Sequence, residues 1–220
     1  MGLFSIFRRR PRYVYSKNEV DALEDYITQQ YGEIETVFHE LKSPDIHLDI
    51  YVIKPTQQEN YYKLVTIGVG AYQMQVPEEL KNLGMDRAEL VIFLPADWNI
   101  KGAKEVDYWP IRMMKMVGRL PIIYKTWIGE GHSIASEDGN PYAENTRQNS
   151  CFLLCAMSGA GEARSLLLPS GKKVRFYQLI PTYQEEMDYK LKNGCQALVQ
   201  KLHENGINML IDPQRKNVCK

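Results

Sequence analysis

Alternation of apolar and polar residues predicts several strands along this chain. Residues 47–53 are the clearest case, because apolar side chains share one face while His47, Asp49 and Tyr51 share the other. A similar run precedes this one, and the polar stretch 42–45 between the two runs indicates a hairpin. Further strands are predicted at 61–72, 87–95 and 151–157, and a second hairpin is predicted at 164–181.

Apolar residues at helical spacing predict four helices, each with a start or stop signal. Capping residues begin the first and last helices, a proline begins the third and another ends it, and glycine closes the first and the last. The predicted helices are 16–32 with a capping box at Ser16 and Glu19, 76–84, 109–120 between Trp109–Pro110 and Pro121, and 182–206 with Gly194 near its middle.

The order of these elements predicts one α/β domain over residues 16–220, with a mixed central sheet flanked by helices. Residues 87–95 are nearly all apolar at their centre, which is typical of a central strand covered on both faces. Residues 126–134 and the polar stretch 136–150 are predicted to be irregular. The arginine-rich residues 1–15 are predicted to form a flexible basic arm.

Composition narrows the classes of partner. Of the 220 residues, 44% are hydrophobic and 25% charged, as in ordinary globular proteins that bury a core. Lys and Arg together number 27, as do Asp and Glu, so no global field favours nucleic acid or an anionic membrane. No apolar run is long enough to cross a bilayer. We therefore expect neither nucleic-acid binding nor stable membrane association.

The four cysteines do not form the two close pairs of a structural zinc site. Cys151 and Cys155 share one face of a predicted strand and are expected to pack as small apolar side chains. Reduced thiols fit a cytoplasmic protein. The glycine clusters lack phosphate-loop spacing, and no serine-nucleophile motif occurs. We therefore predict no catalytic residue and no cofactor.

One polar cluster remains a candidate for metal or acid–base chemistry. His47 and Asp49 lie on one face of a predicted strand, and His39 on the neighbouring strand could point the same way. A metal site needs three or four converging ligands, and no motif reinforces these residues. We therefore interpret His47 and Asp49 as structural and predict no bound metal. A metal-dependent enzyme or metal-binding protein centred on His39, His47 and Asp49 is the alternative.

Seven segments occur in the order found in one known family, the suppressor-of-fused domain family. The chain resembles its single-domain bacterial members most closely. The segments that carry the resemblance are 47–56, 64–80, 87–98, 108–121, 126–134, 176–194 and 211–215.

The resemblance implies an α/β fold without catalysis and a function in protein binding. Animal members bind and restrain a transcription factor in Hedgehog signalling, and they use a second, C-terminal domain that we do not expect here. Bacterial members are proposed to be immunity proteins that neutralise toxins of polymorphic toxin systems. The resemblance therefore implies a non-enzymatic immunity protein whose partner is a toxin domain.

The resemblance also implies a partner-binding segment between Arg119 and His132. In animal members the matching segment lies beside the partner-binding groove, and Trp127, Glu130, Gly131 and His132 match it here. The acid stands one place away from the acidic position of the family. A large aromatic ring flanked by polar groups is also typical of a binding hot spot. We expect these five residues to contact the partner.

Overall fold

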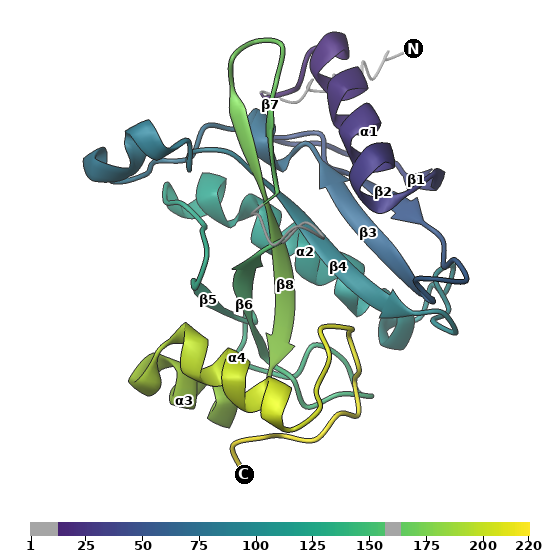
Figure 1. Ribbon diagram of the computed structural model, residues 1–220, viewed down its shortest axis with the longest axis vertical. Helices are drawn as coiled ribbons and strands as arrows, with labels where there is room; N and C mark the ends of the chain where they lie inside the picture. The colour runs from purple at the N-terminus through teal and green to yellow at the C-terminus, as the bar shows by residue number, and fades with distance from the viewer. Residues whose placement is uncertain (1–12, 157–163) are drawn as a thin grey trace, which may run out of the picture.

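The computed structural model describes residues 13–156 and 164–220, which contain one eight-stranded mixed sheet (Figure 1). Seven strands follow the order β1–β2–β3–β4–β8–β6–β5, and β7 pairs with β8 beside this path. The first four strands form an antiparallel meander, in agreement with the first predicted hairpin. They are β1 (Ile34–Phe38), β2 (Asp49–Ile53), β3 (Tyr61–Ile67) and β4 (Ala88–Pro95).

β8 (Lys173–Thr182) joins the two halves of the sheet. It pairs in parallel with β4 and antiparallel with β6 (Ser150–Cys155) and β7 (Ser165–Leu167). The mixed sheet and the second predicted hairpin are thereby confirmed. β5 (Ser133–Ala135) pairs with β6 at one edge of the sheet. Residues 126–132 are irregular as predicted, but Ser133 and Ile134 are not, because a strand of three residues is too short to show alternation.

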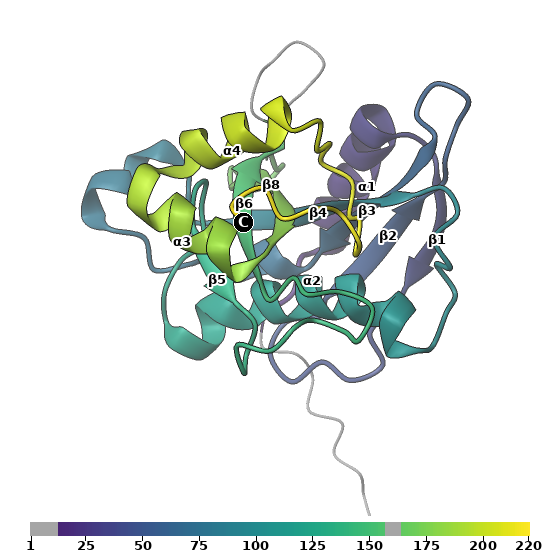
Figure 2. The same ribbon diagram turned by 90° about the horizontal axis from the view of Figure 1, so that it is seen from below.

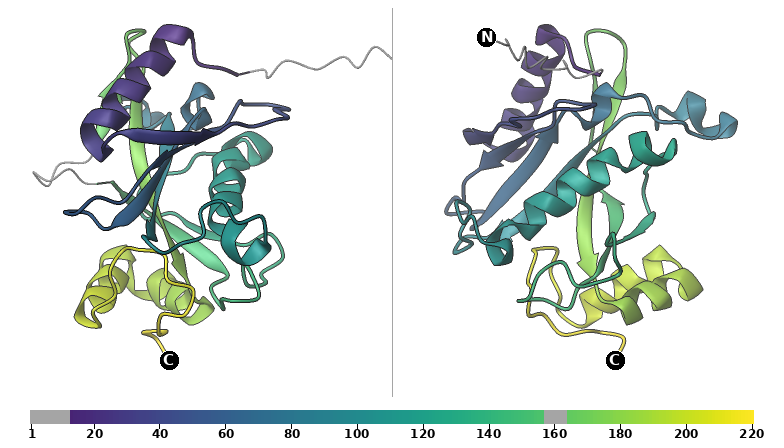
Figure 3. Two further views of the ribbon diagram at one scale, coloured as in Figure 1. Left: turned by 90° about the vertical axis from the view of Figure 1, so that its right-hand side faces the viewer. Right: turned by 180° about the vertical axis from the view of Figure 1, so that it is seen from behind.

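Helices cover both faces of the sheet and one of its ends. α1 (Lys17–Tyr31) lies on one face and α2 (Glu105–Tyr124) on the opposite face, as the side view in Figure 3 shows. α3 (Gln184–Asn193) and α4 (Cys195–Glu204) lie at the end where β8 finishes (Figure 2). Two short 3-10 helices, η1 (Val69–Ala71) and η2 (Glu78–Leu83), lie between β3 and β4.

The alternation along β2 directs neighbouring residues into two different cores. Ile50 and Val52 belong to the core beneath α2, whereas Tyr51 and Ile53 belong to the core beneath α1. β4 is likewise buried on both faces along most of its length, as its apolar sequence predicted. Each such side chain contributes about 1.5–3 kcal/mol when fully buried, so the strands are fixed by packing on both faces.

α2 extends beyond both prolines that were expected to bound it. It begins at Glu105 rather than at Pro110, and it continues past Pro121 to Tyr124. Pro110 has no N–H for the carbonyl of Val106, four residues earlier. The side-chain amide of Asn145 donates to that carbonyl instead, at 3.1 Å. A hydrogen bond from a distant loop therefore keeps the helix intact, and the predicted start and stop were wrong.

The single C-terminal helix predicted from the sequence is two helices. Gly194 ends α3 and begins α4 with a φ of 92°, a conformation that residues with a side chain rarely adopt. The helix axis therefore changes at a glycine that was expected to lie within one helix. Gly206, with a φ of 69°, closes α4 as predicted.

The predicted boundary of the N-terminal arm needs a correction. Residues 1–12 lie outside the described residues, as does the turn predicted at 158–161. Tyr13, however, bridges to Ile46 in parallel, and Tyr15 is buried in the core beneath α1. Residues 13–15 are therefore part of the folded structure, and only residues 1–12 can form the arm.

Candidate functional site

The loop between β1 and β2 brings together the three side chains of the candidate metal cluster. His39 Nδ1 lies 2.8 Å from Asp49 Oδ2, and His47 Nε2 lies 3.2 Å from Asp49 Oδ1. One donor atom from each of the three residues lies within 4.8 Å of the other two. His39 thus does point the same way as His47 and Asp49. The side chains of His39, His47 and Asp49 are 67%, 42% and 10% exposed, so the cluster opens to solvent on its histidine side.

Hydrogen bonds behind His47 fix the orientation of its ring. Ser43 Oγ donates to Glu40 Oε2 at 2.9 Å and lies 2.7 Å from His47 Nδ1. The Ser43 hydroxyl has only one proton, so it must accept its second hydrogen bond from His47 Nδ1–H. The backbone N–H of Glu40 donates to Asp49 Oδ1 at 2.9 Å. His47 therefore presents Nε2 to Asp49.

Arg119, expected to contact a partner, is instead part of the network behind the histidines. Its guanidinium donates to Glu40 Oε1 at 2.6 Å and to Asp45 Oδ1 at 3.2 Å. The Arg119 side chain is only 15% exposed. It joins α2 to the loop between β1 and β2, so its charge is neutralised within the chain.

A cavity of about 270 Å³ adjoins the cluster on the face of the sheet that α1 covers. Gly68 shapes its floor, with a φ of 129° and its Cα so close to His47 that an added Cβ would lie 1.9 Å from the His47 carbonyl oxygen. Only glycine fits there. The side chains that line the cavity are Val14, Tyr15, Val20, His47, Asp49, Tyr51 and Ile67.

Glu89, which the sequence analysis did not single out, is completely buried in β4 beside this cavity. It accepts five hydrogen bonds at 2.6–3.3 Å, from the hydroxyls of Tyr15 and Thr66 and from the backbone N–H groups of residues 68–70. Burial raises the pKa of Glu89 to about 7, and these hydrogen bonds oppose the rise only in part. The carboxylate holds the turn after β3 in place. The only sign of this in the sequence is an acid inside an apolar run.

The predicted partner-binding residues after α2 form a compact surface, which we call the Trp127 surface (residues 127–132). The rings of Trp127 and His132 meet edge to face with their centroids 4.2 Å apart. Trp127 also packs partly against the core beneath α2. An added Cβ at Gly129 would lie 2.6 Å from the Trp127 ring, and Gly131 has a φ of 79°. Glu130 is exposed. Four of the five predicted residues therefore lie together, whereas Arg119 belongs elsewhere.

A hollow of about 560 Å³ separates the Trp127 surface from α3. Its lining includes Leu120, Trp127, all of β5 and Leu191, which is exposed. On one side Lys190 Nζ donates to the carbonyl of Gly131 and to Ser133 Oγ, both at 2.6 Å. Burial lowers the pKa of His132, so its ring is neutral at pH 7. The hollow is thus mainly apolar, with one ammonium group whose hydrogen bonds already fix it.

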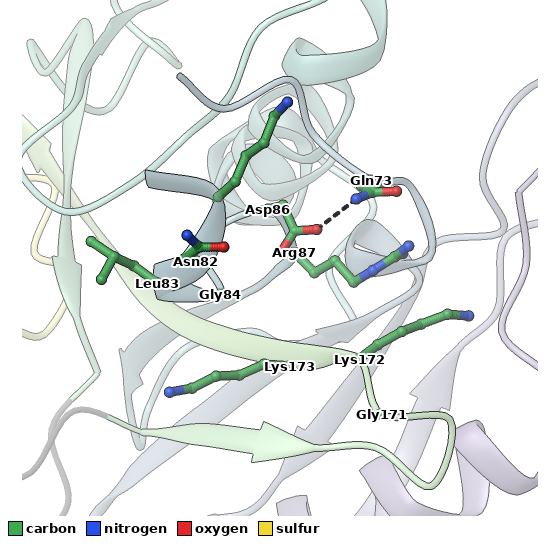
Figure 4. Close-up of a pocket in the computed structure, with 10 residues that line it drawn as sticks. Gln73, Asn82, Leu83, Gly84, Asp86, Arg87, Gly171, Lys172 and Lys173 are labelled. Carbon is green, nitrogen blue, oxygen red and sulfur yellow. Dashed lines mark hydrogen bonds between the residues drawn. The ribbon is translucent and has the colours of Figure 1, made fainter. Parts of the chain in front are cut away.

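A second hollow, of about 500 Å³, is basic and lies between η2 and the turn from β7 to β8 (Figure 4). Arg87 donates to the carbonyls of residues 70 and 71, and Lys172 pairs with Glu19 at 2.9 Å. Lys81 pairs within its own 3-10 helix. Figure 4 shows Lys172 and Lys173 pointing in opposite directions. These cations do not converge on one point, so the hollow is not a candidate anion site.

The cysteines behave as their sequence context suggested. All four are free thiols, Cys151 is buried in the core beneath α2, and Cys155 packs against that core. Burial, with a contribution from Glu130, raises the pKa of Cys155 to about 12, so it remains a thiol at neutral pH. Among residues 13–156 and 164–220, no helix combines the length and apolar character needed to cross a membrane.

Comparison with known proteins identifies the family. The family model described as suppressor of fused protein (SUFU) matches residues 44–216, which is most of the chain. The chain belongs to the suppressor of fused protein family. The resemblance noted in the sequence is thereby confirmed.

Individual relatives of this SUFU family member are distant but cover nearly its whole length. It is 26% identical to the uncharacterized protein UU111 of Ureaplasma parvum, covering 94% of this chain and 99% of that protein. A SUFU homolog from Neisseria gonorrhoeae has 17% identity and a TM-score of 0.60 over 93% of this chain and 96% of that one. A chain of the Sufu–Fu complex has 13% identity and a TM-score of 0.64, with coverage of 95% and 93%.

The structure of Drosophila Suppressor of Fused is related over only part of its length. It matches with 14% identity and a TM-score of 0.57 over 91% of this chain, which spans 51% of the Drosophila chain. At these identities the solved structures establish the shared fold alone.

Proposed function

We propose that this chain is a non-enzymatic protein-binding domain that holds an extended segment of its partner against β5. The observation that carries the proposal is an edge strand beside an apolar hollow. Among the described residues β5 pairs only with β6, and the ring of Trp127 lines the hollow next to it. An unpaired strand edge beside a side-chain pocket is how many domains bind a peptide by strand addition.

The hydrogen bonds of β5 support a free edge of this kind. His132 and Ser136, which flank the strand, bond to the backbone on the β6 side at 3.0 and 2.8 Å. In an antiparallel ladder, alternate residues direct their N–H and C=O groups to opposite sides. Ser133 and Ala135 therefore direct theirs away from β6, where a strand of the partner can pair with them.

The side chains around the hollow suggest the character of the bound segment. Leu120, Trp127 and Leu191 offer apolar surface, and the exposed Glu130 precedes the lining residue Gly131 in the chain and adds one negative charge. We therefore expect a partner strand that inserts an apolar side chain into the hollow. Interfaces with an aromatic anchor and a polar rim concentrate their binding energy at the anchor.

We further infer that the partner is a toxin domain, which the chain neutralises as an immunity protein. The likeness to single-domain bacterial members supports this inference, and a structure of the same fold within the Sufu–Fu complex supports a binding role in general. The four free thiols are consistent with the cytoplasm, where an immunity protein would meet its toxin.

The test is capture of the partner from a lysate of the native host by the intact chain and by two variants. Glu130→Lys with His132→Ala reverses the exposed charge next to Gly131 and removes the ring partner of Trp127. Ala135→Pro removes an outward N–H without touching the bonds to β6. Both variants should stay folded by circular dichroism and weaken capture, by about 2 kcal/mol or more where a hot spot is lost.

A matched double variant, Glu137→Lys with His203→Ala, makes the same chemical changes at exposed positions outside the hollow and should capture normally. Full capture by the folded Glu130/His132 variant would place the interface elsewhere. The toxin assignment has a separate test, because the captured protein should stop growth when expressed alone and allow growth when co-expressed with this chain. A captured protein that does not stop growth would refute the assignment of the partner as a toxin, but it would not refute the proposed interface.

A further inference from the structure

We propose that His39, His47 and Asp49 form a binding site for a divalent transition-metal ion of the zinc type. This site lies on the loop between β1 and β2 and is independent of the partner surface beside β5. His39 and Glu40 precede the residues matched by the family model, so the proposal rests on the geometry of this chain. Two imidazoles and one carboxylate are a common three-ligand set for zinc and other first-row transition ions.

The strongest reason for a cation is the contact between His47 and Asp49. Because His47 Nδ1–H donates to Ser43, Nε2 is the ring nitrogen that faces Asp49 Oδ1, 3.2 Å away. Both atoms can ligate a metal ion. His39, only 2.8 Å from the other oxygen of Asp49, adds the third donor that a metal site requires, and one donor atom from each residue lies within 4.8 Å of the other two.

The residues behind the ligands provide the support found around bound metals. Metal-binding histidines usually donate their second N–H to an acceptor that fixes the ring. Here Ser43 accepts from His47, Glu40 accepts from Ser43, and Arg119 neutralises Glu40 at 2.6 Å. The backbone N–H of Glu40 also orients Asp49. Arg119, Glu40 and Ser43 thus hold His47 and Asp49 in place without an ion.

The surroundings leave room for an ion and for its remaining ligands. His39 is mostly exposed, so an ion can enter from solvent on that side. On the other side the cavity of about 270 Å³ reaches His47 and Asp49, and it can hold water or a small anion on the ion. Nitrogen donors disfavour Mg²⁺ and Ca²⁺, which prefer oxygen ligands. A site with three protein ligands and open positions therefore fits Zn²⁺, Co²⁺ or Ni²⁺.

The test uses the full chain without a histidine tag, stripped of metal by a chelator and titrated with ZnCl₂ in a calorimeter. We expect one saturable equivalent of Zn²⁺ per chain. His39→Ala and Asp49→Asn should abolish this binding, and both should fold normally because His39 is exposed and asparagine retains an oxygen acceptor. Ser43→Ala, which removes only the support of His47, should weaken binding by about 10- to 100-fold.

His203→Ala is the matched control, since it removes an exposed histidine of α4 and should bind Zn²⁺ like the parent chain. Co²⁺ provides a second readout, because nitrogen and oxygen ligands give visible bands without the thiolate charge-transfer band that cysteine would add. A parent chain that takes up no Zn²⁺, or equal binding by the His39→Ala and His203→Ala variants, would overturn the proposal.

Discussion

Glu89 and Asp49 are two carboxylates on the same face of the sheet, yet their surroundings differ in one decisive respect. Their neighbours in sequence, Leu90 and Ile50, both pack beneath α2, so the two acids point toward the side covered by α1. Glu89 is fully buried and receives five hydrogen bonds, three of them from backbone N–H groups. Asp49 receives one backbone N–H and faces two histidines that reach solvent.

The difference separates a structural carboxylate from a candidate ligand. Backbone donors cannot leave Glu89 without unfolding the turn after β3, so that carboxylate has no capacity for another partner. His39 beside Asp49 is mostly exposed and can turn toward solvent, whereas the ring of His47 is fixed by Ser43. Burial alone therefore does not mark a functional acid, because the exposure of its partners matters as much.

The largest effect is expected from Glu89→Ala. This truncation leaves five buried donors without their acceptor, and we expect the free energy of unfolding to fall by roughly 3–5 kcal/mol. Urea denaturation followed by circular dichroism measures the change. Glu35→Ala, at an exposed position of β1, should leave the midpoint unchanged. A cost below about 1 kcal/mol for Glu89→Ala would show that the turn does not depend on this carboxylate.

The raised pKa of Glu89 predicts a dependence of stability on pH. The folded protein keeps the proton up to a pH of about 7, whereas the unfolded chain loses it near its ordinary value of 4.5. The stabilisation from this group is therefore complete below pH 4.5 and declines as the pH rises to 7. Relative to Glu89→Gln, the parent chain should lose roughly 2–3 kcal/mol between pH 5 and pH 7.5. Parallel curves for the two proteins would contradict the shift.

Two truncations of the N-terminus test whether Tyr15, which donates a hydrogen bond to Glu89, contributes to stability. Deleting residues 1–12 should leave the melting temperature unchanged, because these residues precede the bridge of Tyr13 and the capped start of α1. Deleting residues 1–15 also removes the buried ring and hydroxyl of Tyr15, at a cost of about 2–3 kcal/mol. Calorimetric melting of the two truncations gives the comparison, and equal melting temperatures would exclude a role for Tyr15.

A smaller loss of stability than for Glu89→Ala is expected from Asp49→Ala. The change leaves one backbone N–H without its acceptor, while His39 can turn toward water and His47 keeps its bond to Ser43, so we expect a loss of about 1 kcal/mol. The same urea experiment measures it beside Glu89→Ala. If the two truncations cost the same, the contrast fails between Glu89, which is held by three backbone donors, and Asp49, which is held by one.

Features with a local cause could be predicted from the sequence. The strands follow from alternation, and the capping box at Ser16 and Glu19 is present in the structure. The face on which His47 and Asp49 lie was also correct, because the period of a strand fixes it. The convergence of His39 with them depends on the path of a ten-residue loop, for which sequence offers no comparable rule.

Features with a distant cause could not be predicted. Asn145 supplies the hydrogen bond that lets α2 include Pro110, although the two residues lie far apart in the chain. Arg119 was expected to contact a partner, but in the folded chain it pairs with Glu40 and Asp45. Glu186 is likewise buried and paired with Arg215, which comes from the C-terminal segment. In each case the partner is chosen by the tertiary fold, and a lone charged or proline residue is the only local sign.

The parallel pairing of β4 with β8 has a consequence for synthesis of the protein. Ala88 in β4 pairs with Arg175 in β8. The edge of β4 that faces away from β3 therefore stays unpaired until 87 further residues have been made. At a translation rate of about 5–20 residues per second, the ribosome needs roughly 4 to 17 s to produce them. During this interval the apolar edge of β4 is open, and such edges recruit strands from other chains. Nascent chains that stall before residue 173 should therefore depend on chaperones, whereas chains that have released β8 should not.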